Sequence, residues 1–254
     1  MSIRLLAAGL VLATLPACFG FEVEAQAGYA QLALDGDLGY VSGTNNVAIS
    51  QDIESAFGLG DDQGTPFVRA KMDLGVPVLS VSAFQFEDEG TGRLQADFGD
   101  VPFIPGGTPV ASTVDLLSAK TALAFDIPIG PVTLSPGIAA DYVDLDISVR
   151  DLIGIASEQV ELQAPLPLLF ARGQVDLGIV SGVLEVGYAA VDVDDVEAAL
   201  LDVEALAIVR PTPLLELFVG YRLISLEVDG EVDGDTVDTD LDLSGWMIGG
   251  GVRF

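Results

Sequence analysis

Extended segments in which apolar and polar residues alternate recur along most of the chain. From Leu117 to Ile127 nearly every second residue is apolar, while Lys120 and Asp126 lie on the other face. The segments 201–209 and 215–223 repeat the pattern. A period of two is that of a β-strand with one apolar and one polar face. These alternations run for nine residues or more, which is the length that a tilted strand needs to cross the hydrocarbon of a bilayer.

Short turns rich in Gly and Pro alternate with connections that are mostly longer and polar. The short turns are 75–77, 128–131, 178–182 and 210–213, and the longer connections are 35–65, 88–112, 150–158, 192–196 and 229–240. This order predicts ten strands, at 21–34, 66–75, 78–87, 112–127, 132–149, 159–177, 183–191, 197–209, 214–228 and 241–254. An even number of strands, with both termini at the short-turn end, is typical of an outer-membrane barrel. We therefore expect an all-β fold, a single antiparallel transmembrane β-barrel over residues 21–254, with eight strands as the alternative count.

The first 20 residues have the pattern of a signal peptide. Arg4 precedes an apolar run of 11 residues from Leu5 to Leu15, and the small residues Ala17, Cys18 and Gly20 then offer cleavage sites. The run is too short for a transmembrane helix. Cys18 follows a loose match to a bacterial lipoprotein box, so a lipid on Cys18 is the alternative to a cysteine in a discarded signal.

Composition excludes several classes of function. The 254 residues contain 10 Lys and Arg, 39 Asp and Glu, no His and one Cys, for a formal net charge of −29. Such an acidic chain lacks the cations that hold nucleic acid phosphates, so no nucleic acid partner is expected. Without His there is no His base, no His metal ligand and no Ser-His pair. Because GxSxG, P-loop and GxGxxG patterns are also missing, we expect that the protein is not an enzyme and carries no cofactor.

If the apolar faces meet lipid, the charged faces line the lumen. Rare cations then lie opposite carboxylates, which makes burial of both tolerable. The predicted lumen network comprises Arg69, Lys71, Asp73, Lys120, Asp126, Arg172, Asp176, Glu185, Asp202, Glu204, Glu216 and Arg222. A ten-stranded barrel is narrow enough for side chains to fill. We expect a packed polar core; the alternative is a narrow gated path for small solutes, whose conductance would change on mutation of Arg172 or Arg222.

The last strand carries an apolar face that ends at the C-terminal residue. Its members are Trp246, Ile248, Val252 and Phe254. A terminal Phe behind alternating apolar residues resembles the signal that the bacterial barrel-assembly machinery reads, and Trp246 fits an aromatic girdle. The alternative is a plain apolar edge strand.

The surplus acidic residues are concentrated in the predicted long connections. These are expected to be solvated loops that face outward, among lipopolysaccharide. In one of them, acidic residues occupy positions 1, 3, 5, 7 and 12 of a twelve-residue window with Gly at position 6, the spacing of a calcium loop. The residues are Asp229, Glu231, Asp233, Asp235 and Asp240. Asp at position 12 and flanking strands argue against this calcium site.

Several short motifs, in order, resemble the small OmpW-like outer-membrane barrels. They are 65–70, 76–79, 166–171, 220–222 and the ending 249–254, with glycines before a terminal aromatic residue. The resemblance implies the outer membrane of a Gram-negative bacterium, eight strands and a hydrophobic lumen that in some members is linked to small hydrophobic molecules. We therefore expect a monomeric membrane barrel that is structural or a passive pathway for a small solute or hydrophobic molecule. The alternative is a secreted or surface-attached β-sandwich binding module.

Overall fold

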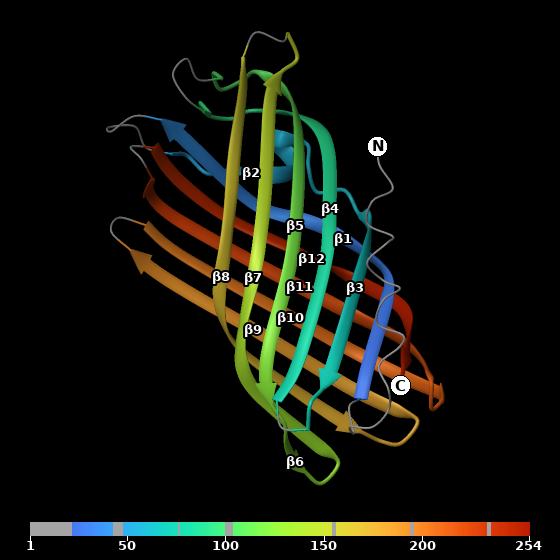
Figure 1. Cartoon of the computed structure of the whole chain (residues 1–254). Helices are drawn as coiled ribbons and strands as arrows, with labels where there is room; N and C mark the ends of the chain where they lie inside the picture. Colours follow the sequence, from blue (N-terminus) through green and yellow to red (C-terminus); the bar gives the residue numbers. More distant parts are fainter. Residues whose placement is uncertain are drawn as a thin grey trace.

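The computed structural model describes residues 22–42, 48–75, 77–99, 104–153, 156–193, 196–232 and 235–254. The predicted signal peptide and Cys18 lie outside these residues. Ten long strands follow one another around a barrel (Figure 1): β1 (Glu22–Ser42), β3 (Gln63–Asp73), β4 (Pro77–Arg93), β5 (Pro109–Phe125), β7 (Val132–Asp151), β8 (Ser157–Asp176), β9 (Val180–Val193), β10 (Val196–Thr212), β11 (Leu215–Val232) and β12 (Asp235–Arg253).

The barrel is closed by its first and last strands. β12 pairs with β1 in antiparallel register from Glu24↔Arg253 to Ser42↔Asp235, and each other strand pairs with the next around the ring. Closure satisfies the backbone groups that an open sheet edge would leave exposed. The predicted ten-stranded antiparallel barrel is thus confirmed, and both the eight-strand count and the two-sheet sandwich are wrong.

Two short strands lie outside the ring. β2 (Gln51–Asp52) pairs with β1, and β6 (Ile127–Ile129) forms a hairpin with the start of β7. A single π-helical turn (η3, Ile53–Phe57) follows β2. The Asp52 side chain accepts a hydrogen bond from the Ser55 amide at its start, and Gly58 ends it in the left-handed conformation, with φ 72°.

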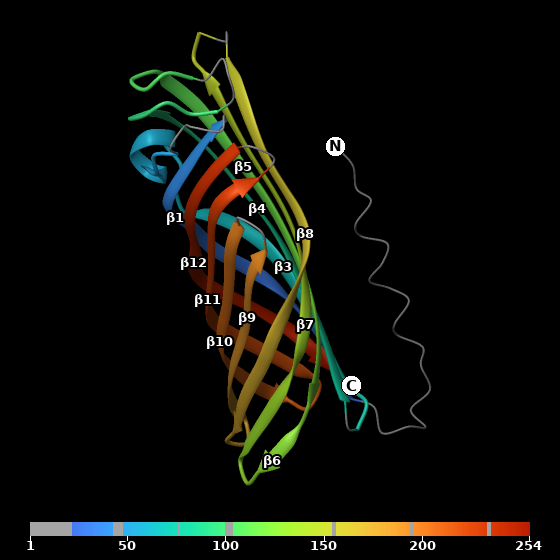
Figure 2. The same ribbon diagram turned by 90° about the vertical axis from the view of Figure 1, so that its left-hand side faces the viewer.

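The strands are longer than the sequence pattern predicted. The segments 88–93, 109–112 and 229–232, expected in loops, continue β4, β5 and β11, and β1 extends to Ser42. Acidic residues such as Glu89 and Asp192 therefore lie on strands instead of in loops. Figure 2 shows the resulting tall, narrow barrel.

The reason for this error is that the alternation reverses along the strands. In the lower part of β7, at the end of the barrel where the C-terminus lies in Figure 1, Ile138 points outward and Ser135 is buried inside. Past Tyr142 the outward positions become Asp144 and Asp146, while the inward positions Val143, Leu145, Ile147 and Val149 are apolar and buried. The lower half is thus apolar outside and charged inside, and the upper half is acidic outside and apolar inside.

A folded segment completes the upper wall between β1 and β4. β3 begins only at Gln63, and residues 48–62 fill the space above it. Ile53, Phe57 and Leu59 are buried there, and the Phe57 ring packs edge-on against Phe98 at 5.2 Å between centroids. The predicted loop at 35–65 is therefore the end of β1 followed by a packed wall segment.

The outward apolar side chains of the lower half are not covered by a second layer in the part of the chain that the structure describes. Val68 is 55% exposed, Leu123 38% and Leu217 58%, and Val203 is half-buried in the wall. We call this surface the apolar belt. Water is a poor solvent for such a contiguous surface, which indicates an apolar environment around it. None of the described helices is long or apolar enough to cross a bilayer.

Candidate functional site in the barrel lumen

Charged side chains from opposite walls meet in the middle of the lower lumen. On one side Lys120 of β5 places Nζ 2.6 Å from Oδ2 of Asp202 on β10, four strands away around the ring. Arg222 of β11 approaches the same carboxylate, with Nη2 at 3.0 Å. All three side chains are buried. Asp202 thus holds two cations together and ties three strands across the lumen.

On the other side of this layer, two arginines bind two glutamates: Arg69 contacts both Glu185 and Glu204, and Arg172 contacts Glu185. Arg172 Nη2 lies 2.6 Å from Oε1 of Glu185 on the neighbouring strand. Arg69 reaches across the barrel from β3, with Nη2 2.7 Å from the same oxygen and Nη1 bonded to Glu204. We call this layer the central ion network; its members are Arg69, Lys120, Arg172, Glu185, Asp202, Glu204 and Arg222.

Aromatic rings lie against the central ion network. The Arg222 guanidinium is 4.5 Å from the centroid of the Phe84 ring, and Arg172 is 5.9 Å from that of Phe170. Phe67 and Phe218 pack edge-on at 5.7 Å inside the same barrel. Rings and paired charges together fill the lumen, as expected for a narrow barrel.

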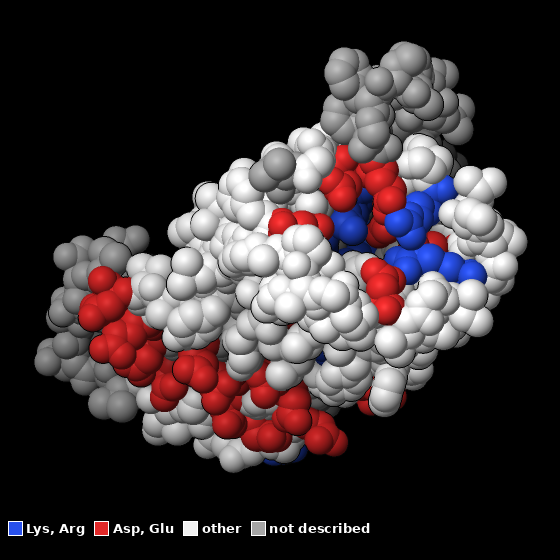
Figure 3. All heavy atoms as spheres, turned by 90° about the horizontal axis from the view of Figure 1, so that it is seen from below, with Lys and Arg blue, Asp and Glu red and all other residues white. Residues whose placement is uncertain are grey.

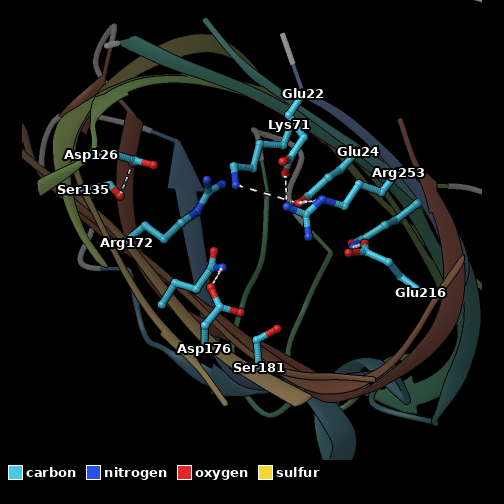
Figure 4. Close-up of polar contacts among 12 residues, drawn as sticks. Glu22, Glu24, Lys71, Asp126, Ser135, Arg172, Asp176, Ser181, Glu216 and Arg253 are labelled. Carbon is cyan, nitrogen blue, oxygen red and sulfur yellow. Dashed lines mark hydrogen bonds and ion pairs between the residues drawn. The ribbon is translucent and has the colours of Figure 1, made fainter. Parts of the chain in front are cut away.

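A second group of charges lies at the lower end of the lumen, where Lys71 and Arg253 point toward Glu24 (Figure 4). Arg210 Nε is 2.7 Å from Oε1 of Glu216, whose other oxygen accepts a 2.7 Å hydrogen bond from Gln26. We call it the rim network; its ion-paired members are Glu22, Glu24, Lys71, Asp176, Arg210, Glu216 and Arg253. Viewed from this end, Lys and Arg gather in the hollow of the barrel, whereas a stripe of Asp and Glu runs along the outside (Figure 3).

The two networks leave little open space. The cavity between them measures about 20 Å³ and is bounded by Gln26, Arg69, Lys71, Arg172 and Arg210, among others. A volume of this size holds about one water molecule. The lower lumen is therefore a packed polar layer and not an open channel in this structure.

Ten of the twelve residues proposed for the lumen network are joined in these ion pairs. The two others make local contacts: Asp73 accepts from the Gly75 amide, and Asp126 accepts from Ser135. Reasoning from the sequence missed Glu22, Glu24, Gln26, Asp141 and Arg210 as network residues. Arg210 was assigned to a Pro-rich turn, but β10 continues through Thr212. Asp141 accepts a 3.0 Å hydrogen bond from Ser118 and is buried beside Lys120, its direct partner in the β5–β7 ladder.

Above the central ion network the lumen becomes apolar. A small cavity of about 40 Å³ borders Ser118 and Asp141, with walls that include Phe86, Leu145 and Leu226. A larger cavity of about 330 Å³ continues upward and shares Leu145 and Leu226 with it. We call the larger one the upper cavity; its walls are Leu38, Tyr40, Leu145, Ile147, Gln159, Val160, Glu161, Leu162, Leu226, Val228, Val237 and Thr239. Its size is within the usual range of about 300–1,000 Å³ for small-molecule pockets.

The residues of the suggested calcium loop belong to the β11–β12 hairpin. Asp229 faces Asp238 across the ladder, and Asp240 faces Glu227. The side chains of Glu231, Asp233 and Asp235 lie outside those that the structure describes. Among the described residues, no group of three or more acidic or Cys side chains is arranged to hold a metal ion. Calcium binding stays a prediction.

The apolar face of the last strand is on the outside of the barrel. Trp246 and Ile248 are each 67% exposed, Val252 is 42% exposed and Phe254 55%. Trp246 packs edge-on against Tyr221 of β11, with 5.3 Å between ring centroids. The four residues of the predicted assembly signal therefore form part of the apolar belt.

Comparisons with known proteins identify the fold of this chain and not its family. No protein-family model matches the sequence, and no curated protein matches it. The structure is similar to the outer membrane protease OmpT from Escherichia coli, with a TM-score of 0.55 and 9% identity over 95% of this chain and 99% of that one. It has weaker similarity to Ail of Yersinia pestis in complex with the heparin analogue sucrose octasulfate, with a TM-score of 0.37, 12% identity and coverage of 92% and 99%. A Pseudomonas aeruginosa FadL homologue has a TM-score of 0.31 and 10% identity, over 92% of this chain and 90% of that one. The chain thus has the fold of an outer-membrane β-barrel.

Proposed function

We propose that this protein is an integral barrel of a Gram-negative outer membrane that takes up a small hydrophobic molecule in its upper half and is closed below. The observation that carries the proposal is the reversal of the strand alternation. It produces an apolar belt outside the lower half and an apolar cavity inside the upper half. The OmpW-like resemblance agrees with a hydrophobic lumen, although those barrels have eight strands and this one has ten.

Membrane insertion is supported by the outer surface. The apolar belt combines aliphatic residues with Trp246 and Tyr221, the side chains typical of barrel–lipid interfaces. Above it the outward residues are acidic: Glu87, Asp115, Asp146 and Glu161 stand in register on four successive strands. Charged residues at these positions are costly in hydrocarbon and favourable in water, so the upper half is expected to stand outside the bilayer.

A passive pore for polar solutes is less well supported. An open pore needs a continuous water-filled lumen, and here the central ion network and its aromatic neighbours fill the lower half. The packed polar core, which was the first expectation from the sequence, accounts better for the contacts. We propose that the charges act structurally, by holding opposite walls together.

We also propose that the protein is not an enzyme. It shares its fold with a protease, but similarity at 9% identity carries no activity to this chain. The sequence contains no histidine to act as a base. Assembly by the barrel-assembly machinery, contact with lipopolysaccharide and a monomeric state belong to the same proposal.

A contact quencher tests uptake in the upper cavity. Tyr40 lines this cavity, so a Tyr40→Trp/Trp246→Phe variant has one tryptophan inside, whereas the wild type has its one tryptophan outside. We expect 1-bromooctane, which is uncharged, to quench the tryptophan fluorescence of both proteins in detergent. Adding Leu226→Phe to the inside reporter should lower its quenching by filling the cavity, while Leu217→Phe, outside on the same strand, should not. Quenching of Trp246 alone would overturn the proposal.

A further inference from the structure

The wall of the barrel is incomplete between β8 and β9. The ladder between them runs from Asp176↔Ser181 to Leu169↔Tyr188 and stops there. β8 continues upward to Ser157, and in the described part of the chain this length pairs only with β7, on its other edge. Residues 189–193 of β9 pair only with β10. Figure 1 shows β8 rising beside β7 while β9 runs obliquely away.

Two prolines explain why the ladder stops. The amide of Asp176, an even-numbered residue of β8, donates to Pro131 beside β7, whereas that of Leu177 donates toward β9 at Val180. Backbone groups alternate sides along a strand, so the odd-numbered residues of β8 face β9. Pro165 and Pro167 are odd-numbered and have no N–H to donate. Proline is found on free edges because it blocks further pairing, and the separation is therefore encoded in the sequence.

The upper cavity lies directly behind this gap. Val160 and Leu162 of β8 line it from one side, and Leu226 and Val228 of β11 from the other. Val160 and Leu162 are only half-buried, unlike Ile147 and Val149 on the fully paired β7, which are 1% and 0% exposed. Gln159 and Glu161, which occupy outward positions of β8, also border the cavity. A residue can border a cavity from outside the wall only where the wall is open.

The gap begins at the upper boundary of the apolar belt. Just below it, Leu169 is 72% exposed and Tyr188 47% exposed. Ten residues further up β8, Gln159 donates hydrogen bonds of 2.7 Å to Asp146 and 2.9 Å to Glu161. A molecule moving sideways from the outer lipid surface would therefore pass apolar and tyrosine side chains first and carboxylates next.

We infer that the β8–β9 gap is a lateral portal through which an uncharged hydrophobic molecule passes from the outer leaflet into the upper cavity, while anionic amphiphiles are rejected. The inference rests on the proposed uptake function and adds its route and its charge selection. The carboxylates of Asp146 and Glu161 at the mouth repel an anionic head group. One cation, Arg150 of β7, is exposed nearby in register with Ser157, beyond Gln159 at the start of β8. A fatty-acid carboxylate or an anionic lipid is thus a poor occupant, and a hydrocarbon or a neutral amphiphile is a good one.

Cross-linking across the gap tests the route. The background protein is the Tyr40→Trp/Trp246→Phe reporter with Cys18→Ser. A Pro167→Cys/Ala190→Cys pair in it would lie on the β8 and β9 edges of the gap, where a bismaleimide would cross-link them. We expect the bridge to slow quenching by 1-bromooctane about tenfold or more in stopped flow, relative to the same protein before bridging. The matched pair Ala171→Cys/Val186→Cys lies in register below the gap, and its bridge should leave the rate unchanged. Equal rates with and without the portal bridge would overturn the lateral route yet leave uptake itself intact.

A matched quencher tests the charge selection. We expect 8-bromooctane-1-sulfonate, with the same chain and a permanent negative charge, to quench the inside reporter more weakly than 1-bromooctane. The variant Asp146→Asn/Glu161→Gln should narrow this preference by about threefold at low salt. The control Glu87→Gln/Asp115→Asn removes two acidic residues from the same outward acidic row, on β4 and β5 away from the gap. This control should leave the preference for 1-bromooctane unchanged. A preference that the mouth variant leaves unchanged would overturn charge selection. Absence of quenching by either compound would instead contradict the proposed function.

Discussion

Glu185 on β9 and Glu204 on β10 stand directly opposite each other in the barrel wall, and both are buried in the lumen. Like charges at such facing positions destabilise a sheet. Here Arg69 offsets this repulsion from the opposite wall, because it contacts both carboxylates from β3, which is five strands from β9 and four strands from β10 around the ring. One side chain thus connects the two halves of the circumference.

Arg69→Met should therefore destabilise the barrel strongly. The substitution leaves two adjacent buried carboxylates with Arg172, which contacts Glu185, as their one remaining direct ion-pair partner among the described residues. Breaking a buried ion pair typically costs about 3–5 kcal/mol. We expect a loss of that size in the free energy of unfolding, measured by urea titration in lipid vesicles. Adding Glu204→Gln to Arg69→Met should recover part of the loss. If Arg69→Met unfolds like the wild type, the central ion network does not hold the walls together.

The packed lower lumen predicts a silent barrel in planar bilayers. Between the two networks there is room for about one water molecule, so ions have no continuous path. The wild type should show no steady conductance after insertion is verified by proteolysis or gel mobility. A stable, reproducible channel in the wild type would contradict the packed core and favour the gated path, in which Arg172 or Arg222 controls the current.

The upper wall segment depends on close contact between backbones. A Cβ added at Gly90 of β4 would collide with the carbonyl oxygen of Gly58, at the end of the π-helical turn. Gly90→Ala should therefore displace residues 48–62 and speed their cleavage in limited proteolysis of folded protein. Gly64→Ala is the matched control, because a Cβ there meets no atom within 4 Å. Equal cleavage of the two variants would show that the segment does not need this contact.

The apolar belt and the acidic upper half predict opposite responses to a positive charge on one strand. Leu217→Arg places a cation in the apolar belt and should lower the unfolding free energy in lipid by about 2–4 kcal/mol. Glu227→Arg, also outward on β11 but in the upper half, should cost little, since it relieves repulsion with Asp240 across the ladder. Equal costs in the two variants would mean that both positions meet the same medium.

The sequence predicted the lower half of this barrel well and the upper half poorly. Where apolar residues face outward, as from Leu117 to Ile127, a period of two marks both the strand and its charged face. Where the phase reverses, as at Glu89 on β4 and Asp229 on β11, the strand was predicted to be a polar connection, because outward carboxylates resemble a loop. Which face of an amphipathic strand points outward depends on whether lipid or water surrounds the barrel at that height, and a single sequence does not show this.

The long-range contacts were beyond the sequence for a different reason. Periodicity placed Arg69 and Glu204 on the lumen side, but which charges meet depends on the shear and diameter of the closed barrel. Glu24 was missed because the alternation at the start of β1 is diluted by small residues such as Ala25, Ala27 and Gly28. Pro165 and Pro167 were read as part of a family motif, and their effect on the wall appears only once the neighbouring strand is known.

The central claim is that the outward apolar face of the lower half meets fatty acyl chains. Trp246, the one tryptophan of the chain, lies on that face and is 67% exposed. We predict that, in vesicles, lipids brominated on their acyl chains quench Trp246 fluorescence strongly, whereas acrylamide in the water quenches it weakly. Strong quenching by acrylamide with none by brominated lipids would show that this face meets water or protein, and the membrane assignment would be wrong.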